Sequence, residues 1–298
     1  MNITQRACET IASITAHGAS KQDLQEKKLD KLAVRSVGTE RTYRQAFKGY
    51  LRWLIDNRIS LDDAGFRPMM LEYLEEFAEG HAQKSVNQAK NMLEKVYSVR
   101  LPWFESCIPA VVQRRAYDFD QVERLIAFQT PQNQLSTLLC YDAGLRSHEC
   151  ITLRERALGK PSPRRNWTDA RFCGRTDVEV FLVTGKGGLT REVAISTPLA
   201  RELRKYARPH PTVIRDREIE HLSYFEIGGG QALSTSFSRA SQIALGWTRG
   251  VHGLRHSFAH NRMRTLIPLV GAKLALEILS QELGHFRPEI CLAYLVGR

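Results

Sequence analysis

Seven residues in the C-terminal part of the chain have the types and the spacing needed for chemistry on a phosphate ester. In chain order they are Arg146, Glu149, Lys186, His252, Arg255, His285 and Tyr294, and they fall in four short segments. A tyrosine hydroxyl is a nucleophile, an arginine fork matches two phosphoryl oxygens, and lysine and histidine move protons. Such a set could break a phosphodiester bond with arginines in the role that a metal ion has in other enzymes.

Each segment also has an ordinary structural interpretation when it is taken alone. An Arg–Glu pair three residues apart, such as Arg146 and Glu149, is usually a surface ion pair. The glycines around Lys186 are typical of a hairpin turn, and they do not form the phosphate-binding loop of nucleotide-dependent enzymes. A His-x-x-Arg pair on a helix is usually structural, and a tyrosine near a C-terminus usually packs. The functional interpretation therefore depends on the joint presence and order of the four segments.

Taken together, the four segments resemble the tyrosine recombinase (phage integrase) family over residues 120–298. That family's catalytic set is Arg, Lys, His-x-x-Arg, His and Tyr, in this order. The matching stretches here are Gly144-Leu145-Arg146 with Glu149, Gly185-Lys186-Gly187 with Arg191, His252 to Ala259, and Glu282-Leu283-Gly284-His285. The stretch from Glu282 to Leu295 is most similar to integrases of prophages and other mobile elements in bacteria.

This resemblance implies a site-specific DNA recombinase that cleaves and rejoins DNA through a 3′-phosphotyrosine intermediate. Tyr294 would attack the phosphate, while Arg146 and Arg255 would neutralise its oxygens. Lys186 would protonate the departing 5′ oxygen. The resemblance implies no metal ion, no cofactor and no ATP.

The remaining members of the set have supporting or proton-transfer roles in the same picture. His252 would act as the general base toward the tyrosine, and His285 would hydrogen-bond a phosphoryl oxygen. Glu149 would orient Arg146 or a histidine. A type IB topoisomerase-like enzyme that relaxes DNA, or a non-catalytic DNA-binding protein, remains an alternative.

The implied partner is double-stranded DNA with specific recombination sites. On DNA the protein is expected to form a tetramer, and when free to be a monomer or a weak oligomer. Accessory factors that bend DNA or set the direction of the reaction are further expected partners. The expected location is the bacterial cytoplasm, associated with the nucleoid and not with a membrane.

Composition agrees with a DNA-binding protein. Residues 1–120 carry 18 basic and 16 acidic side chains, a net charge of +2, whereas residues 121–298 carry 25 and 16, a net charge of +9. This asymmetry indicates a polyanionic partner for the C-terminal part. The six cysteines have no metal-binding spacing, so reduced thiols are expected. There is no apolar run long enough for a membrane span, and residues 1–20 lack the apolar core of a secretory signal.

An amphipathic helix is predicted to begin near Thr39, a good N-cap residue. Its apolar stripe is formed by Tyr43, Ala46, Phe47, Tyr50, Leu51 and Leu54. The opposite face carries four basic residues expected to contact DNA, namely Arg41, Arg44, Lys48 and Arg52. Two further helices are expected at Pro68–Glu79 and Gln83–Val99.

The fold class predicted for the chain is mainly α, with a small β-hairpin or sheet in the C-terminal domain. Strands are expected at Val178–Thr184 and Arg191–Ser196, and helices near Asp120, at Leu135–Ala143 and from Ser147, with a mostly helical remainder after Thr197. The resemblance implies a C-shaped clamp of two domains. We expect a basic arm or short helix at 1–36, a helical core-binding (SAM-like) domain at 37–101, a linker at 102–118 and a catalytic domain at 119–298. Four more basic residues are expected to bind DNA: Arg114, Arg115, Arg164 and Arg165.

Overall fold

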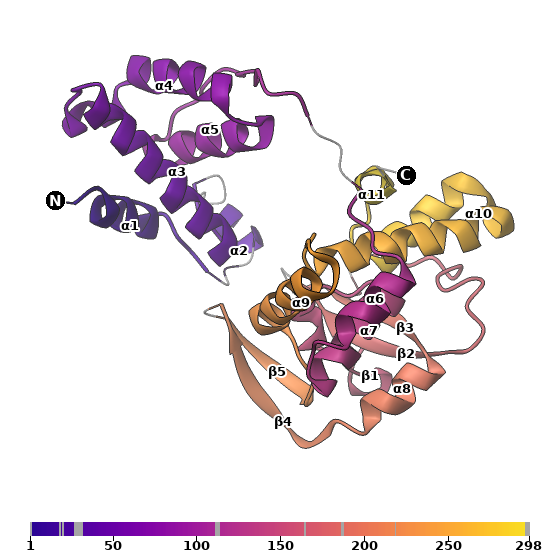
Figure 1. Ribbon diagram of the computed structural model, residues 1–298. Coiled ribbons are helices and arrows are strands. Elements are labelled where there is room, and N and C mark those ends of the chain that lie inside the picture. The colour runs from indigo at the N-terminus through magenta and orange to yellow at the C-terminus, as the bar shows by residue number, and fades with distance from the viewer. Residues whose placement is uncertain are drawn as a thin grey trace. The chain divides into compact units, whose positions relative to one another are not determined.

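The computed structural model describes residues 2–17, 19, 21–26, 32–110, 114–163, 165–185, 188–217 and 219–295 (Figure 1). The chain divides into two compact units, Met1–Val111 and Val112–Arg298. Within the described ranges, no helix combines the length and the hydropathy that a bilayer-spanning segment needs.

Unit 1 is helical. Its elements are α1 (Ile3–Ser13), α2 (Lys21–Glu26), α3 (Val37–Asp56), the 3-10 turn η1 (Leu61–Gly65), α4 (Arg67–Gly80) and α5 (Gln83–Tyr97). The predicted stripe on α3 is the centre of the core, since Tyr43, Phe47, Tyr50, Leu51 and Leu54 are all buried. Helix α3 begins earlier than predicted, because Ser36 is its N-cap and accepts a hydrogen bond from the backbone N–H of Thr39 at 3.1 Å.

Helix α1 lies in the segment that the sequence indicated as a basic arm. Its residues Ala7 and Ile11 are buried in the same core cluster as the stripe on α3. These two apolar positions are four residues apart, so they share one helical face and pack together. The short helix allowed for this segment is therefore present, and it packs into the core of unit 1.

Unit 2 combines helices with two small antiparallel sheets. Its elements are α6 (Phe119–Ile126), α7 (Pro131–Ala143), η2 (Ser147–Cys150), β1 (Arg154–Glu155), η3 (Arg156–Leu158), β2 (Val178–Thr184), β3 (Thr190–Ser196), α8 (Thr197–Arg204), β4 (Ala207–Asp216), β5 (Ile219–Phe225), α9 (Gly230–Leu245), α10 (His252–Glu282) and α11 (Pro288–Leu295). The sheets have the strand orders β1-β2-β3 and β4-β5. The two predicted strands are confirmed as β2 and β3, and their register pairs Thr184 with Thr190 at the turn.

Sequence reasoning misassigned one segment of unit 2 and missed a hairpin in another. The segment from Ser147 is a single 3-10 turn, η2, and it leads into β1 instead of a longer helix. The remainder after Thr197 is mostly helical, as predicted, but β4 and β5 form a hairpin that the sequence did not indicate. Pro209 and Pro211 lie within β4, and prolines argue against a strand in sequence reasoning except at sheet edges.

Two glycines with positive φ end helices of unit 2 and provide a matched test of its packing. Gly144 ends α7 with φ 61°, and Gly246 ends α9 with φ 77°. A Cβ atom on Gly144 would lie 2.5 Å from a ring carbon of Phe258, whereas a Cβ on Gly246 would meet no atom within 4 Å.

We therefore expect Gly144→Ala to destabilise unit 2 more than Gly246→Ala does. Both substitutions cost about 1–2 kcal/mol for a left-handed alanine, and overpacking at Gly144 adds about 1–3 kcal/mol. Urea unfolding of the two variants measures the difference. Equal losses would contradict the close packing of α7 against Phe258.

Candidate active site

Arg146 and Glu149 are locked together at the turn between α7 and β1. Gly144 ends α7, and its left-handed conformation turns the chain so that η2 follows directly. The carboxylate of Glu149 accepts hydrogen bonds from the backbone N–H of Arg146 and from its Nη1, both at 2.8 Å. The predicted pairing of the two residues therefore exists, and it is a buried contact and not a surface ion pair.

Arg255 is fully buried in the first turns of α10. Its Nη1 donates to the carbonyl oxygen of Gly144 and its Nη2 to that of Leu283. These two main-chain bonds hold the guanidinium so that Nε faces the hydroxyl oxygen of Tyr294 at 3.3 Å. Burial, together with the nearby Arg146, lowers the pKa of Arg255 to about 10, which still leaves a cation at neutral pH.

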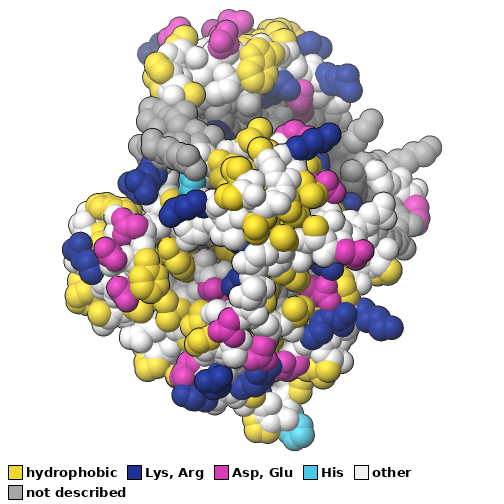
Figure 2. Space-filling view, turned by 90° about the vertical axis from the view of Figure 1, so that its right-hand side faces the viewer, with side chains coloured by type: hydrophobic (Ala, Val, Ile, Leu, Met, Phe, Trp, Pro, Cys, Tyr) yellow, Lys and Arg dark blue, Asp and Glu magenta, His cyan; other side chains and the backbone are white. Residues whose placement is uncertain are grey.

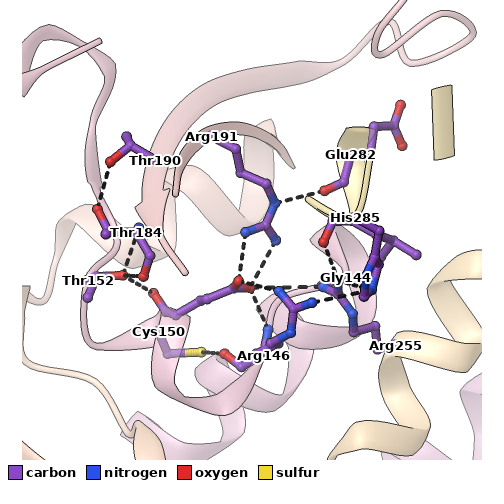
Figure 3. Close-up of polar contacts among 12 residues, drawn as sticks. Gly144, Arg146, Cys150, Thr152, Thr184, Thr190, Arg191, Arg255, Glu282 and His285 are labelled. Carbon is purple, nitrogen blue, oxygen red and sulfur yellow. Dashed lines mark hydrogen bonds and ion pairs between the residues drawn. The ribbon is translucent and has the colours of Figure 1, made fainter. Parts of the chain in front are cut away.

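Tyr294 lies on α11 with 6% of its surface exposed. Besides Arg255, its hydroxyl oxygen meets Nε2 of His285 at 3.0 Å. The same Nε2 is 3.3 Å from Nη2 of Arg146 and 3.3 Å from Nη2 of Arg255. Two arginines, a histidine and the tyrosine thus converge from the N-cap of η2, α10, the 283–285 turn and α11. Figure 3 shows Arg146, Arg255 and His285 of this cluster.

His285 is neutral in this arrangement. Burial and the neighbouring Arg255 lower its pKa to about 3. Because a guanidinium has no acceptor atom, Nε2 of His285 must be the unprotonated nitrogen, whose single lone pair faces these donors. The imidazole proton then lies on Nδ1, and Tyr294 can donate its hydroxyl proton toward Nε2.

Two further histidines of α10 border the tyrosine. The ring centroid of the exposed His252 is 5.6 Å from that of Tyr294. His256, one turn later and buried, has its Nδ1 3.2 Å from the backbone oxygen of Tyr294. Burial lowers the pKa of His256 to about 4, so a neutral ring donates this bond and anchors α11. Sequence reasoning gave His256 no role, although its spacing of four from His252 placed both on one helical face.

Glu149 also has a second arginine partner that sequence reasoning did not assign. Arg191 on β3 donates to both of its oxygens, from Nη1 at 2.7 Å and from Nη2 at 2.9 Å. Burial alone would raise the pKa of Glu149, but Arg191, Arg255 and Arg146 together hold it well below its ordinary value. The carboxylate is therefore ionised.

A cavity of about 370 Å³ opens beside this cluster. It is lined by Arg146, His148, Glu149, Gly185, Leu189, Arg191 and Gly284. Two of these residues, Gly185 and Leu189, flank the turn between β2 and β3. Lys186, the predicted acid in that turn, lies outside the described residues. Across the described part of the chain, no group of His, Cys, Asp or Glu is arranged to hold a metal ion.

The eight residues expected to contact DNA are exposed or half-buried wherever the structure describes them. Arg41 and Arg52 are exposed on α3, and Arg44 pairs with the buried Glu40. Lys48 is half-buried, Arg114 and Arg115 are exposed, Arg165 lies over the Phe286 ring, and Arg164 is outside the described residues. On the face in Figure 2, the coloured basic and acidic side chains are interspersed. DNA contact by these residues stays a prediction.

No protein-family model matches this sequence, and no curated protein matches it. Solved structures do. XerH site-specific recombinase bound to difH substrate, in a pre-cleavage complex, is 15% identical with a TM-score of 0.56, covering 98% of this chain and 90% of that chain. The Tn1549 transposon integrase in complex with transposon right end DNA is 13% identical with a TM-score of 0.52, covering 97% and 94%.

A third similar structure, a lambda integrase dimer bound to a COC′ core site, is 17% identical with a TM-score of 0.50 and covers 92% of this chain and 75% of that chain. At such identities the likeness concerns the fold. The predicted fold class, mainly α with small antiparallel sheets, is confirmed. This chain has the fold of the tyrosine recombinases.

Proposed function

We propose that this protein is a site-specific DNA recombinase that cleaves and rejoins DNA through a covalent bond between Tyr294 and a 3′ phosphate. One observation carries the proposal: the hydroxyl oxygen of Tyr294 lies 3.3 Å from Nε of Arg255 and 3.0 Å from Nε2 of His285. The fold supports it, since solved proteins of this fold are recombinases and integrases bound to DNA.

Phosphate binding is the first step. A phosphodiester carries one negative charge, and Arg255 and Arg146 supply two fixed positive charges beside Tyr294. Arg255 is held by main-chain oxygens, so it costs little reorganisation when charge develops on the phosphoryl oxygens. The side chain of Arg146 is 25% exposed, which leaves it accessible to an incoming phosphate.

Cleavage and rejoining follow from the same geometry. The tyrosine oxygen attacks phosphorus, the bond from phosphorus to the 5′ oxygen breaks, and a free 5′-hydroxyl leaves. His252 is the proposed base for the phenol proton, because its ring lies beside Tyr294. Partial desolvation and the neighbouring Arg255 lower the pKa of His252 to about 4, which favours the neutral ring. Lys186 is the proposed acid for the 5′ oxygen. Attack of a 5′-hydroxyl on the phosphotyrosine reverses these steps, so the bond energy is conserved and no ATP is needed.

The two units have separate tasks in this proposal. Unit 1, with the basic face of α3, grips double-stranded DNA, and unit 2 carries the chemistry. Synapsis of two sites requires four subunits, so a tetramer forms on DNA, with accessory factors that bend it or set direction. The mobile-element role and the bacterial cytoplasmic location belong to the same proposal.

The proposal predicts a covalent protein–DNA adduct that forms in excess EDTA, because arginines neutralise the phosphate. A library of random duplexes with nicks, which let the 5′ fragment diffuse away, supplies a trap for a protein whose target sequence is undefined. The expected product is an SDS-resistant, protease-sensitive band with DNA attached through its 3′ phosphate. A band that appears only after addition of Mg²⁺, or attachment through a 5′ phosphate, would overturn the mechanism.

A further inference from the structure

Arg191 is one of the largest fully buried side chains of the protein, and the steps above do not use it. Its Nη1 and Nη2 donate to the two oxygens of Glu149, and its Nε donates to the backbone oxygen of Glu282 at 2.9 Å (Figure 3). All three nitrogens of the guanidinium are therefore engaged inside the protein. With 1% of its surface exposed and its charge matched by Glu149, this side chain is not assigned a direct contact with DNA.

The buried carboxylate of Glu149 explains why an arginine is buried at position 191. Glu149 is 0% exposed, and an ionised carboxylate without water must be matched by donors and positive charge. Arg191 occupies both carboxylate oxygens with a bidentate pair, which is the strongest geometry available to this pair of groups. Arg146 is left with one side-chain bond to Glu149, from Nη1, while its Nη2 faces His285.

Removal of Arg191 would change how Arg146 shares its donors between Glu149 and the phosphate site. Glu149 would remain buried with only Arg146, at 2.8 Å, and Arg255, at 3.9 Å, as cationic partners. Of these two, only Arg146 is partly exposed and free to move. The carboxylate would draw the guanidinium of Arg146 into a bidentate pair of its own, away from the phosphate site. Two positive charges would then be lost around the site, that of Arg191 by deletion and that of Arg146 by its pairing with Glu149.

Arg191 also connects three segments that carry proposed catalytic residues. It holds η2 through Glu149 and the end of α10 through Glu282, three residues before His285. On its own strand it follows Thr190, which pairs with Thr184 at the base of the turn that contains Lys186. Gly284 leaves room for it, because a Cβ atom there would lie 3.1 Å from Cδ of Arg191.

We propose that Arg191 is a positioning residue: by saturating Glu149, it keeps Arg146 free to bind the phosphate and fixes η2 against the His285 turn. The role rests on the proposed recombinase function for its catalytic meaning. The role also predicts that anion binding at Arg146 depends on Arg191, and this dependence can be tested without DNA cleavage.

The test is a double-substitution experiment with Arg191→Met, Arg191→Met combined with Glu149→Gln, and Arg191→Lys. Arg171→Met is the matched control, since Arg171 pairs at 2.8 Å with Glu192, the next residue on β3. The full-length proteins are compared by single-turnover adduct formation at saturating DNA, by DNA affinity, and by calorimetric titration with inorganic phosphate.

For Arg191→Met we expect adduct formation to slow by about a hundredfold or more, DNA affinity to stay within about threefold, and phosphate affinity to fall about tenfold. Glu149→Gln in the same chain removes the carboxylate that captures Arg146, so about tenfold of the rate and most of the phosphate affinity should return. Arg191→Lys should fall between wild type and Arg191→Met, and Arg171→Met should match wild type.

A double variant no better than Arg191→Met in either assay would overturn the role, since a simple structural loss gains nothing from a second substitution. If Arg191→Met does not fold, the same comparison is made with Arg191→Lys alone and combined with Glu149→Gln. If the wild type forms no adduct, the recombinase proposal fails, and the phosphate titrations still decide the role of Arg191. Unchanged phosphate affinity in the variants, or none in the wild type, overturns it.

Discussion

Replacement of Tyr294 by phenylalanine is expected to abolish the covalent adduct completely while DNA binding persists. The substitution removes only the attacking oxygen and its contacts with Arg255 and His285. The ring keeps its packing beside His256, whose Nδ1 bonds the backbone oxygen at this position and not the side chain. Net loss of such hydrogen bonds costs about 0.5–1.5 kcal/mol each, which the fold tolerates. Denaturing gels report the adduct, and gel shifts report binding.

Tyr141→Phe is the matched control for this prediction. Tyr141 on α7 accepts a hydrogen bond from Nδ2 of Asn261 on α10 at 3.1 Å, so its loss also removes one hydroxyl contact with α10. This variant should form the adduct at the wild-type rate. An adduct in Tyr294→Phe would mean that another side chain is the nucleophile, and sequencing of the DNA-linked peptide would identify it.

Elements with strong local signals were predictable from sequence. The strands β2 and β3 have β-branched residues on both sides of a glycine-rich turn, and their predicted bounds agree to within one residue. The apolar stripe on α3 likewise identified the core of unit 1. In both cases the pattern and the packing depend on the same residues, so local reasoning is sufficient.

Elements with a misleading local pattern, or held by distant contacts, were not predictable. The hairpin of β4 and β5 was missed because prolines interrupt its first strand. A helix was predicted from Ser147, in the connection between α7 and β1. Buried ion pairs instead hold this segment as the single turn η2. Sequence spacing cannot show a pair such as Glu149 and Arg191, whose partners are 42 residues apart.

The candidate site was predictable in part. The order of residue types along the sequence identified Arg146, Arg255, His285 and Tyr294 as site candidates. The structure brings these four to hydrogen-bonding distance. The burial of Arg191 was not foreseeable, because arginine is almost never fully buried without a partner, and its partner is known only after folding. The role of Lys186 remains a prediction from the sequence.

Lys186→Ala is expected to slow cleavage by about 10²–10⁴-fold, the usual contribution of a general acid, and to weaken DNA binding only slightly. The 5′ oxygen would otherwise leave as an alkoxide, which is a poor leaving group without a proton. In binding, one lysine supplies a single phosphate contact among many, so its loss changes affinity little. Single-turnover cleavage and gel-shift titrations of the same variant separate the two effects. Lys160→Ala, an exposed lysine before β2, is the control and should behave as wild type.

A substrate with sulfur at the 5′ bridging position decides between proton donation and positioning. A thiolate leaves without protonation, since thiols are far more acidic than alcohols. If Lys186 donates the proton, this substrate restores most of the rate lost in Lys186→Ala and restores little in Tyr294→Phe, which lacks the nucleophile. If the variant stays slow on the sulfur substrate, Lys186 positions DNA instead. The acid must then be another group beside the leaving oxygen, and His252, whose ring lies next to Tyr294, is the first to test.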